Sequence, residues 1–348
     1  MKPEPTKLNR VGIDVSAKTL DVAIETDGKK IPLMCVNNDH TGHKKLLKKL
    51  TKRGYHARVV LEATGSYSFK LAMALEEHPR VEVMVGNPRA LKRFAEACMQ
   101  RGKSDPLDAG SILEFCKRMD FQKWVRPSDA CLELRCITRR IRQLTDDVVA
   151  DKNRLGAKHY EGPTAKMVIN DIEVNIRHLE KRIDLLEKTA LTLIKPHEDL
   201  QSKYDLLITV NGIGQTSALH LLGELMIISK DMTAPQWVAL AGLDPRLCQS
   251  GTSLNKKKRI SKAGNKYIRA ALYMPAMTAA RRDPHIRSFY LKLVDDRKKK
   301  EIVALVAVMR KLLHAIWGMF KYKQPFQGAS FHPLRVEKEQ ACAVHIKQ

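Results

Sequence analysis

The sequence is poor in aromatic and acidic residues. Phe, Trp and Tyr make up 5% of the 348 residues, which argues against a protein that mainly stacks bases along an aromatic groove. We expect no membrane span, because no segment approaches the roughly 20 apolar residues that a span requires. The opening stretch MKPEPTKLNR has no apolar core of a secretory signal. These absences favour a cytoplasmic, nucleoid-associated protein with no membrane partner.

Paired cysteines are also missing. The chain has seven cysteines, an odd number, and none of them forms a Cys-x-x-Cys pair. Such a set is typical of free thiols in a reducing compartment and argues against disulfides or a zinc site.

Positive charge is what the chain has in excess. It carries 62 Lys and Arg against 38 Asp and Glu, which gives a net charge of +24 and a pI near 9.8. A positive field of this size attracts polyanions, of which nucleic acid is the commonest. Composition alone does not separate DNA from RNA.

The first third of the chain predicts an α/β layer structure. The segments VGIDVSAKTLDVAIET and KKIPLMCVNN read as paired strands around a turn at Asp27–Gly28. Helical and strand patterns then alternate: HKKLLKKLTKR, the buried strand RVVLE, YSFKLAMALEEH, VEVMVGN and a helix opened by Pro88. DPLDAGSILEFCKRM is one further helix. We place the end of this domain at residue 127.

The remainder is predicted to be mainly helical. Apolar residues spaced by three and four over 128–195 indicate two long helices, either an antiparallel coiled-coil hairpin that mediates oligomerisation or two ordinary core helices. We assign 128–200 to this segment, 201–328 to a helical C-terminal domain and 329–348 to a tail. EIVALVAVMRKLLHAIWGMF is interrupted by Arg310, Lys311 and His314, so we interpret it as a core helix.

Four acidic residues stand at positions suited to metal binding. Asp14 lies inside an apolar strand, where a carboxylate is costly without a partner, and Glu62 ends a buried strand, where ligands of open α/β sheets bind. Asp105 and Asp108 are three residues apart at a helix start, so they would share one face. Each pair also has a purely structural alternative. Asp14 and Glu62 could form salt bridges, and Asp105 and Asp108 could cap a helix, with Asp105 as N-cap and Asp108 at the third position. Oxygen-only ligands suit Mg²⁺ or Mn²⁺.

Several motifs together resemble a known family. GIDVSAKTLDVAI, LEATGSY, Asn87–Pro88 and KSDPLDA strongly resemble the DEDD-type transposases of a family of bacterial insertion sequences, which includes the Piv-type DNA invertases. VNGIGQTSALHLLGE, ALAGLDP, QSGTS and RISKAGNKYIRAALYMPA extend the resemblance over nearly the whole chain. It implies a RuvC-like N-terminal domain of ribonuclease-H-like fold, a C-terminal transposase domain, and metal binding by Asp14, Glu62, Asp105 and Asp108.

The second half contributes a glycine turn and a basic loop. Gly212 and Gly214 read as a helix-hairpin-helix-like turn that could hold a phosphate, or as a tight packing turn between helices. Ser250 and Ser253 precede a basic run, and most serines in such loops only form turns or contact phosphate. The resemblance implies that Ser250 is a nucleophile; Ser253 is then a phosphate contact. The residues predicted to contact nucleic acid are Gly212, Gly214, Ser253, Lys256, Lys257, Lys258, Arg259, Lys262 and Lys266.

The function predicted from these features is an insertion-sequence transposase with a Mg²⁺-bound acidic site and a serine nucleophile. A phosphoserine intermediate would conserve the phosphodiester energy that hydrolysis discards. The resemblance also implies a non-coding guide RNA as partner beside DNA, and the long helices favour a homo-oligomer, a dimer or a tetramer. The alternatives are a junction-resolvase-like endonuclease without a covalent intermediate and a catalytically inert architectural protein.

Overall fold

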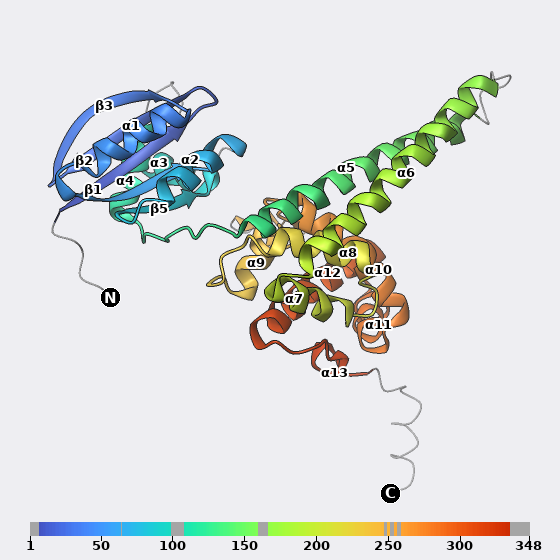
Figure 1. Cartoon of the computed structure of the whole chain (residues 1–348). Coiled ribbons are helices and arrows are strands. Elements are labelled where there is room, and N and C mark those ends of the chain that lie inside the picture. Colours follow the sequence, from blue (N-terminus) through green and yellow to red (C-terminus); the bar gives the residue numbers. More distant parts are fainter. Residues whose placement is uncertain are drawn as a thin grey trace, which may run out of the picture. The chain divides into compact units, whose positions relative to one another are not determined.

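The chain folds into two compact units, residues 1–126 and 127–348, drawn in Figure 1. The computed structural model describes residues 7–63, 65–98, 108–158, 166–246, 249–250, 254–255 and 259–334. The two units are described separately below.

Unit 1 is built on a five-stranded mixed sheet. Its strands are β1 (Leu8–Val15), β2 (Thr19–Thr26), β3 (Lys29–Asn37), β4 (His56–Glu62) and β5 (Val81–Gly86). They lie in the order β3-β2-β1-β4-β5. The first three pair antiparallel, and β4 and β5 run parallel to β1. The predicted turn between β2 and β3 is confirmed, because Asp27 and Gly28 both adopt positive φ, as a two-residue hairpin turn requires.

Helices cover both faces of this sheet. They are α1 (His40–Leu50), α2 (Ser66–Glu76), α3 (Pro88–Ala97) and α4 (Ala109–Arg118), with a short 3₁₀ turn at Lys52–Gly54. Ile13 and Val15 of β1 share a buried cluster with Leu46 of α1 and Leu71 of α2. On the opposite face, Val60 of β4 packs with α3 and α4. The predicted α/β layering is therefore confirmed.

Unit 2 begins with the predicted pair of long helices. Helices α5 (Asp129–Lys158) and α6 (Lys166–Ile194) run side by side as an antiparallel hairpin (Figure 1). Leu144 and Leu179 are among the apolar residues that pack between the two helices in the outer part of the hairpin. At the base, Leu134 and Ile194 belong to the large core of the unit. The hairpin thus grows out of the C-terminal core, because its inner ends share that core's apolar residues.

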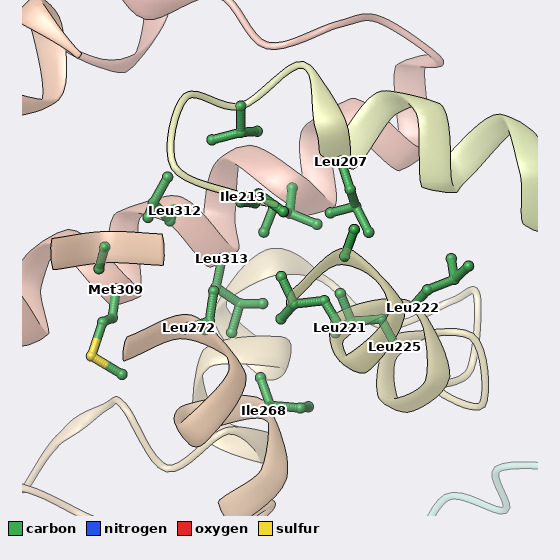
Figure 2. Packing of buried hydrophobic residues seen from close by; sticks show 14 of the residues in the cluster. Leu207, Ile213, Leu221, Leu222, Leu225, Ile268, Leu272, Met309, Leu312 and Leu313 are labelled. Atoms are coloured by element: carbon green, nitrogen blue, oxygen red, sulfur yellow. The ribbon is translucent and has the colours of Figure 1, made fainter. Parts of the chain in front are cut away.

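The rest of unit 2 is a helical body. Its elements are α7 (Glu198–Ile208), α8 (Gln215–Leu225), α9 (Ala234–Leu240), β6 (Pro245–Arg246), β7 (Gln249–Ser250), β8 (Leu254–Asn255), β9 (Arg259–Ile260), α10 (Lys266–Arg282), α11 (Pro284–Leu291), a π-helical turn (Lys292–Asp296), α12 (Glu301–Tyr322) and α13 (Gly328–Phe331). Figure 2 shows how leucines from α7, α8, α10 and α12 converge in the core.

Helix α12 contains the apolar stretch that we interpreted as a core helix. Among the described residues it is the one helix that passes a length and composition test for a membrane span. Its buried residues from Leu305 to Met319 belong to the core of unit 2. These contacts explain its apolar character as that of a core helix, which is the interpretation drawn from the sequence.

The predicted tail begins inside the folded body. Phe331 is 5% exposed and packs against Phe289, and the backbone carbonyl of Pro333 accepts a hydrogen bond from Ser288 Oγ (3.1 Å). The aromatic side chain at 331 therefore holds the segment up to 334 against α11. Residues 335–348 lie outside the described residues.

Candidate active site and nucleic-acid interface

Asp14 and Glu62 lie at the same level near the ends of two neighbouring strands, β1 and β4. In the parallel pair of β1 and β4, Ile13 lies opposite Leu61, so Asp14 and Glu62 come next at the same level. Side chains alternate along a strand. Because Ile13 faces the cluster with α1 and α2, both acids belong to the opposite face. Each is half-buried.

Helix α4 packs on that same face. A Cβ on Gly12 would lie 2.2 Å from the backbone nitrogen of Leu113 and 2.4 Å from the carbonyl oxygen of Ala109. The glycine therefore lets the start of α4 touch β1 two residues before Asp14. Asp108, which directly precedes α4, is thereby brought to the same face and the same end of the sheet.

The alternative reading, in which Asp105 caps this helix and Asp108 stands at its third position, is wrong. Asp108 is the N-cap residue, with an extended backbone, and its Oδ1 accepts hydrogen bonds from the nitrogen (2.6 Å) and hydroxyl (2.8 Å) of Ser111. Asp108 is therefore not at the third position of a helix opened by Asp105. The Ser111 N–H needs an acceptor at a helix start, and Asp108 supplies it. Asp105 lies outside the described residues.

These acids offer a donor set that fits a hard divalent cation. Asp14, Glu62 and Asp108 provide carboxylate oxygens alone, the ligands that Mg²⁺ and Mn²⁺ prefer. In the part of the chain that the structure describes, no three His, Cys, Asp or Glu side chains are grouped closely enough to hold a metal ion. The fourth predicted ligand, Asp105, was outside that search.

In unit 2, short strands hold the ends of the basic loop. Strand β6 pairs with β9, and β7 pairs with β8, so that Ser250 lies opposite Leu254. Ser261 Oγ donates to Asp244 Oδ1 (2.5 Å), which ties the two ends together. Ser250 is thus on a β-ribbon with a fixed base. Ser253 and Lys256 to Lys258 lie outside the described residues.

A buried polar cluster that includes Asn265, a few residues after this loop, was not anticipated from the sequence. The Glu224 carboxylate, 2% exposed, accepts from Arg139 Nε (2.6 Å) and Nη2 (3.1 Å) and from Asn265 Nδ2 (2.6 Å). Arg135 lies 3.7 Å away, and Arg139 stacks 4.3 Å from the Tyr267 ring centre. Asn265 also caps α10. The cluster therefore joins α5, α8 and the chain that leaves the basic loop.

The two turn glycines have different surroundings. Gly212 has φ +105°, and a Cβ there would lie 2.7 Å from the nitrogen of Ala279 and 2.8 Å from the carbonyl oxygen of Pro275. A larger residue at this position would clash with α10. Helix packing therefore explains the glycine without any contact to nucleic acid. Gly214 is the N-cap of α8 and faces open space.

Three of the predicted basic contacts lie within the described residues. Arg259, Lys262 and Lys266 are exposed at the exit of the loop. Lys262 adopts a positive φ, and Lys266 lies 5.3 Å from the centre of the Tyr267 ring. Their common location gives this edge of unit 2 a positive surface, which suits a phosphate backbone.

The five described cysteines are free thiols, as predicted.

Comparison with known proteins gives matches in both units. Residues 11–158 match the DEDD transposase model of IS110, described as "Transposase", and residues 204–291 match "Transposase IS116/IS110/IS902 family". The chain is 28% identical to a pilin gene-inverting protein of Moraxella lacunata and 27% identical to that of Moraxella bovis. Each alignment spans 321 residues, 91% of this chain and 97% of the relative. An IS110 insertion-element protein of Streptomyces coelicolor is 21% identical over 268 residues, 77% of this chain and 61% of that protein. The chain belongs to the IS110 family of transposases.

Proposed function

We propose that the protein cuts and exchanges DNA strands with a metal-dependent acidic site in unit 1 and a serine nucleophile in unit 2. Membership of the transposase family makes the chain a DNA-processing enzyme with DNA as a partner. The metal, the serine chemistry and any further partner are the proposed part.

The observation that carries the proposal is that three acids lie on one face at one end of the sheet. Asp14 and Glu62 end adjacent parallel strands, and Gly12 admits the helix that Asp108 caps. The strand order β3-β2-β1-β4-β5, with three antiparallel strands and two parallel ones, supports the ribonuclease-H-like (RuvC-like) fold proposed for this unit. Asp14, Glu62 and Asp108, with Asp105, are the residues proposed to hold Mg²⁺. When bound, the ion would stabilise charge on a scissile phosphate.

The serine acts from the ribbon in unit 2. Ser250 Oγ would attack the phosphorus and give up its proton. The bond between phosphorus and the 3′ or 5′ oxygen of the strand would break, and that oxygen would take up a proton and leave as a hydroxyl. The phosphoserine bond keeps the energy of the original linkage, so a hydroxyl of another strand can displace the serine without ATP. Arg259, Lys262 and Lys266, exposed at the loop exit, would neutralise the strand during this exchange.

Two further partners are proposed, a guide RNA on the basis of the family resemblance and other copies of the chain on the basis of the α5–α6 hairpin. A non-coding guide RNA encoded by the element would supply sequence specificity through base pairing. The α5–α6 hairpin, with exposed apolar residues such as Leu185 (64%) and Met167 (83%), would join copies into a dimer or tetramer. A cytoplasmic, nucleoid-associated location accords with the net charge of +24.

A cleavage assay tests the acidic site. Labelled DNA carrying the element junction, with element-encoded RNA and Mg²⁺, is incubated with wild-type, Asp14→Asn and Glu62→Gln protein. Loss of one electrostatic group at a reacting phosphate lowers rates by roughly 100-fold or more, so both variants should be nearly inactive. Glu82→Gln on β5, whose carboxylate is paired with Arg58, serves as control. Full cleavage by Asp14→Asn would contradict the proposal.

Mixing inactive variants tests the oligomer. If active centres form between subunits, combining Asp14→Ala with Ser250→Ala protein restores activity, because one chain supplies intact acids and another an intact serine. Absence of restoration, with both variants folded and assembled, would contradict centres that form across subunits.

A further inference from the structure

Unit 2 contains a pocket away from the basic loop. It has a volume of about 510 Å³ and lies between α7, α12 and the segment that connects α8 to α9. The volume is within the ~300–1,000 Å³ typical of small-ligand sites. Its lining includes none of the described residues of the candidate active site.

The pocket combines aromatic walls with a basic rim. Trp237, Trp317 and Phe320 line it, and Trp237 meets Phe320 edge to face at 6.1 Å. Trp317 Nε1 donates to the carbonyl oxygen of Met232 (2.8 Å), which fixes both the ring and the connecting segment. The walls are therefore largely aromatic. Lys321 Nζ lies 4.6 Å from the centre of the Trp317 ring and Lys203 Nζ 5.7 Å from that of Phe320, so a planar ring that stacks on this wall would displace them.

The rim has more positive than negative charge. Lys203, Lys230, Lys321 and Lys323 line the pocket, against Asp199 and Asp231. One aspartate is already engaged, because Lys203 Nζ lies 2.9 Å from Asp199 Oδ1. The other three lysines are exposed around the opening. The rim thus suits an anionic group that remains in solvent while an apolar part enters.

A polar atom of the wall lacks a partner. Trp237 is 7% exposed, and within the described part of the chain its Nε1 is buried without any hydrogen-bond acceptor. Buried donors are nearly always satisfied, and an unsatisfied one costs stability. Nε1 exposes almost no surface, so an acceptor that enters the pocket reaches it only after the surrounding wall moves.

We infer that this pocket binds one unpaired nucleotide of a single-stranded nucleic acid. The base stacks on the aromatic wall and accepts a hydrogen bond from Trp237 Nε1, and the phosphate lies among the rim lysines. The inference rests on the proposed function in one respect, that nucleic acid is the partner. A strand of DNA and a strand of RNA share this chemistry.

The test measures binding in EDTA, where no strand is cut. Fluorescence anisotropy follows labelled 12-nucleotide single strands of DNA and of RNA, and the matching DNA duplex, on the full-length protein. Trp237→Phe keeps an aromatic ring and removes the N–H, so it should weaken single-strand binding by about two- to tenfold. The smaller ring leaves a cavity, which costs stability, and removal of the unsatisfied donor offsets part of that cost, so thermal denaturation should show a variant that remains folded at the assay temperature. Comparing the DNA and RNA arms identifies the strand.

Matched variants separate the pocket from general effects. Lys230→Gln combined with Lys321→Gln should weaken binding and flatten its salt dependence, whereas Lys188→Gln on the exposed face of α6 should do neither. Trp124→Phe in unit 1 repeats the ring change elsewhere and should leave affinity unchanged. Equal affinity of Trp237→Phe and wild type for both single strands, or an equal effect on the duplex, would overturn the inference. Neither result depends on Ser250 or the acids, so failure here leaves the proposed chemistry standing.

Discussion

Removing the charge of Glu224 should destabilise unit 2 although the residue touches no candidate active-site group. Glu224→Gln keeps the shape of the side chain but leaves Arg139 and Arg135 facing a neutral amide in a buried setting. Breaking a buried ion pair costs about 3–5 kcal/mol. The side chains of Arg139 and Arg135 are 32% and 27% exposed, so water screens part of that loss. We therefore expect about 2–4 kcal/mol.

The assay is urea unfolding followed by tryptophan fluorescence in a Trp124→Phe background. The two remaining tryptophans, Trp237 and Trp317, both lie in unit 2, so the signal reports this unit alone. Glu180→Gln, which removes an exposed pair with Lys152 (2.8 Å), is the control and should cost less than about 1 kcal/mol.

The dependence on pH adds a second criterion. Burial opposes ionisation, but hydrogen bonds from Arg139 and Asn265, and the charges of Arg139 and Arg135, give Glu224 a net pKa below the ordinary value. A lowered carboxyl pKa contributes stability that is present above the unfolded-state pKa and is lost as pH falls through the folded-state pKa. The difference between wild type and Glu224→Gln should therefore shrink in acid. A difference below about 0.5 kcal/mol at neutral pH would refute this reasoning.

Three further predictions have defined outcomes. Gly212→Ala should lower the free energy of unfolding of unit 2 by about 2 kcal/mol or more, from left-handed strain and the clash with α10, whereas Gly214→Ala should change it by less than about 1 kcal/mol; thermal denaturation compares them. Gly12→Ala should push α4 off β1, destabilise unit 1 and lower DNA cleavage with every acidic ligand intact. Burial, then Arg142, lower the pKa of His220 to about 4, so stability should fall by about 1.4 kcal/mol per unit as pH drops from 6.5 towards 4; His220→Gln should flatten that slope in urea titrations.

Local periodicity was enough to predict much of the fold. Strands β1 to β5 carry alternating or continuous apolar runs, and Asp27–Gly28 marks a turn by its chemistry, so their prediction needed no distant contact. The hairpin of α5 and α6 was predicted from apolar spacing. The tail was placed too early because a single aromatic, Phe331, decides whether α13 packs.

Long-range partners were beyond such reasoning. Asp105 and Asp108 are both suitable N-cap residues. The local sequence SDPLD does not decide at which of them the helix begins. Glu224 lies 85 residues from Arg139 and 41 from Asn265, so the cluster has no local signature beyond an acid in an apolar helix. From the sequence, glycine at position 212 could serve either to bind a phosphate or to let two helices approach closely. The structure shows close packing against α10, which accounts for the glycine by the second explanation.

The most direct test of the central claim is a covalent-adduct assay. Labelled junction DNA, element-encoded RNA and Mg²⁺ are incubated with the protein, which is then denatured and examined for protein-linked DNA. We expect an adduct with wild type and with Ser253→Ala, and none with Ser250→Ala or Asp14→Ala. Cleavage without an adduct, at the wild-type rate in Ser250→Ala, would contradict the account and make the protein a hydrolytic nuclease.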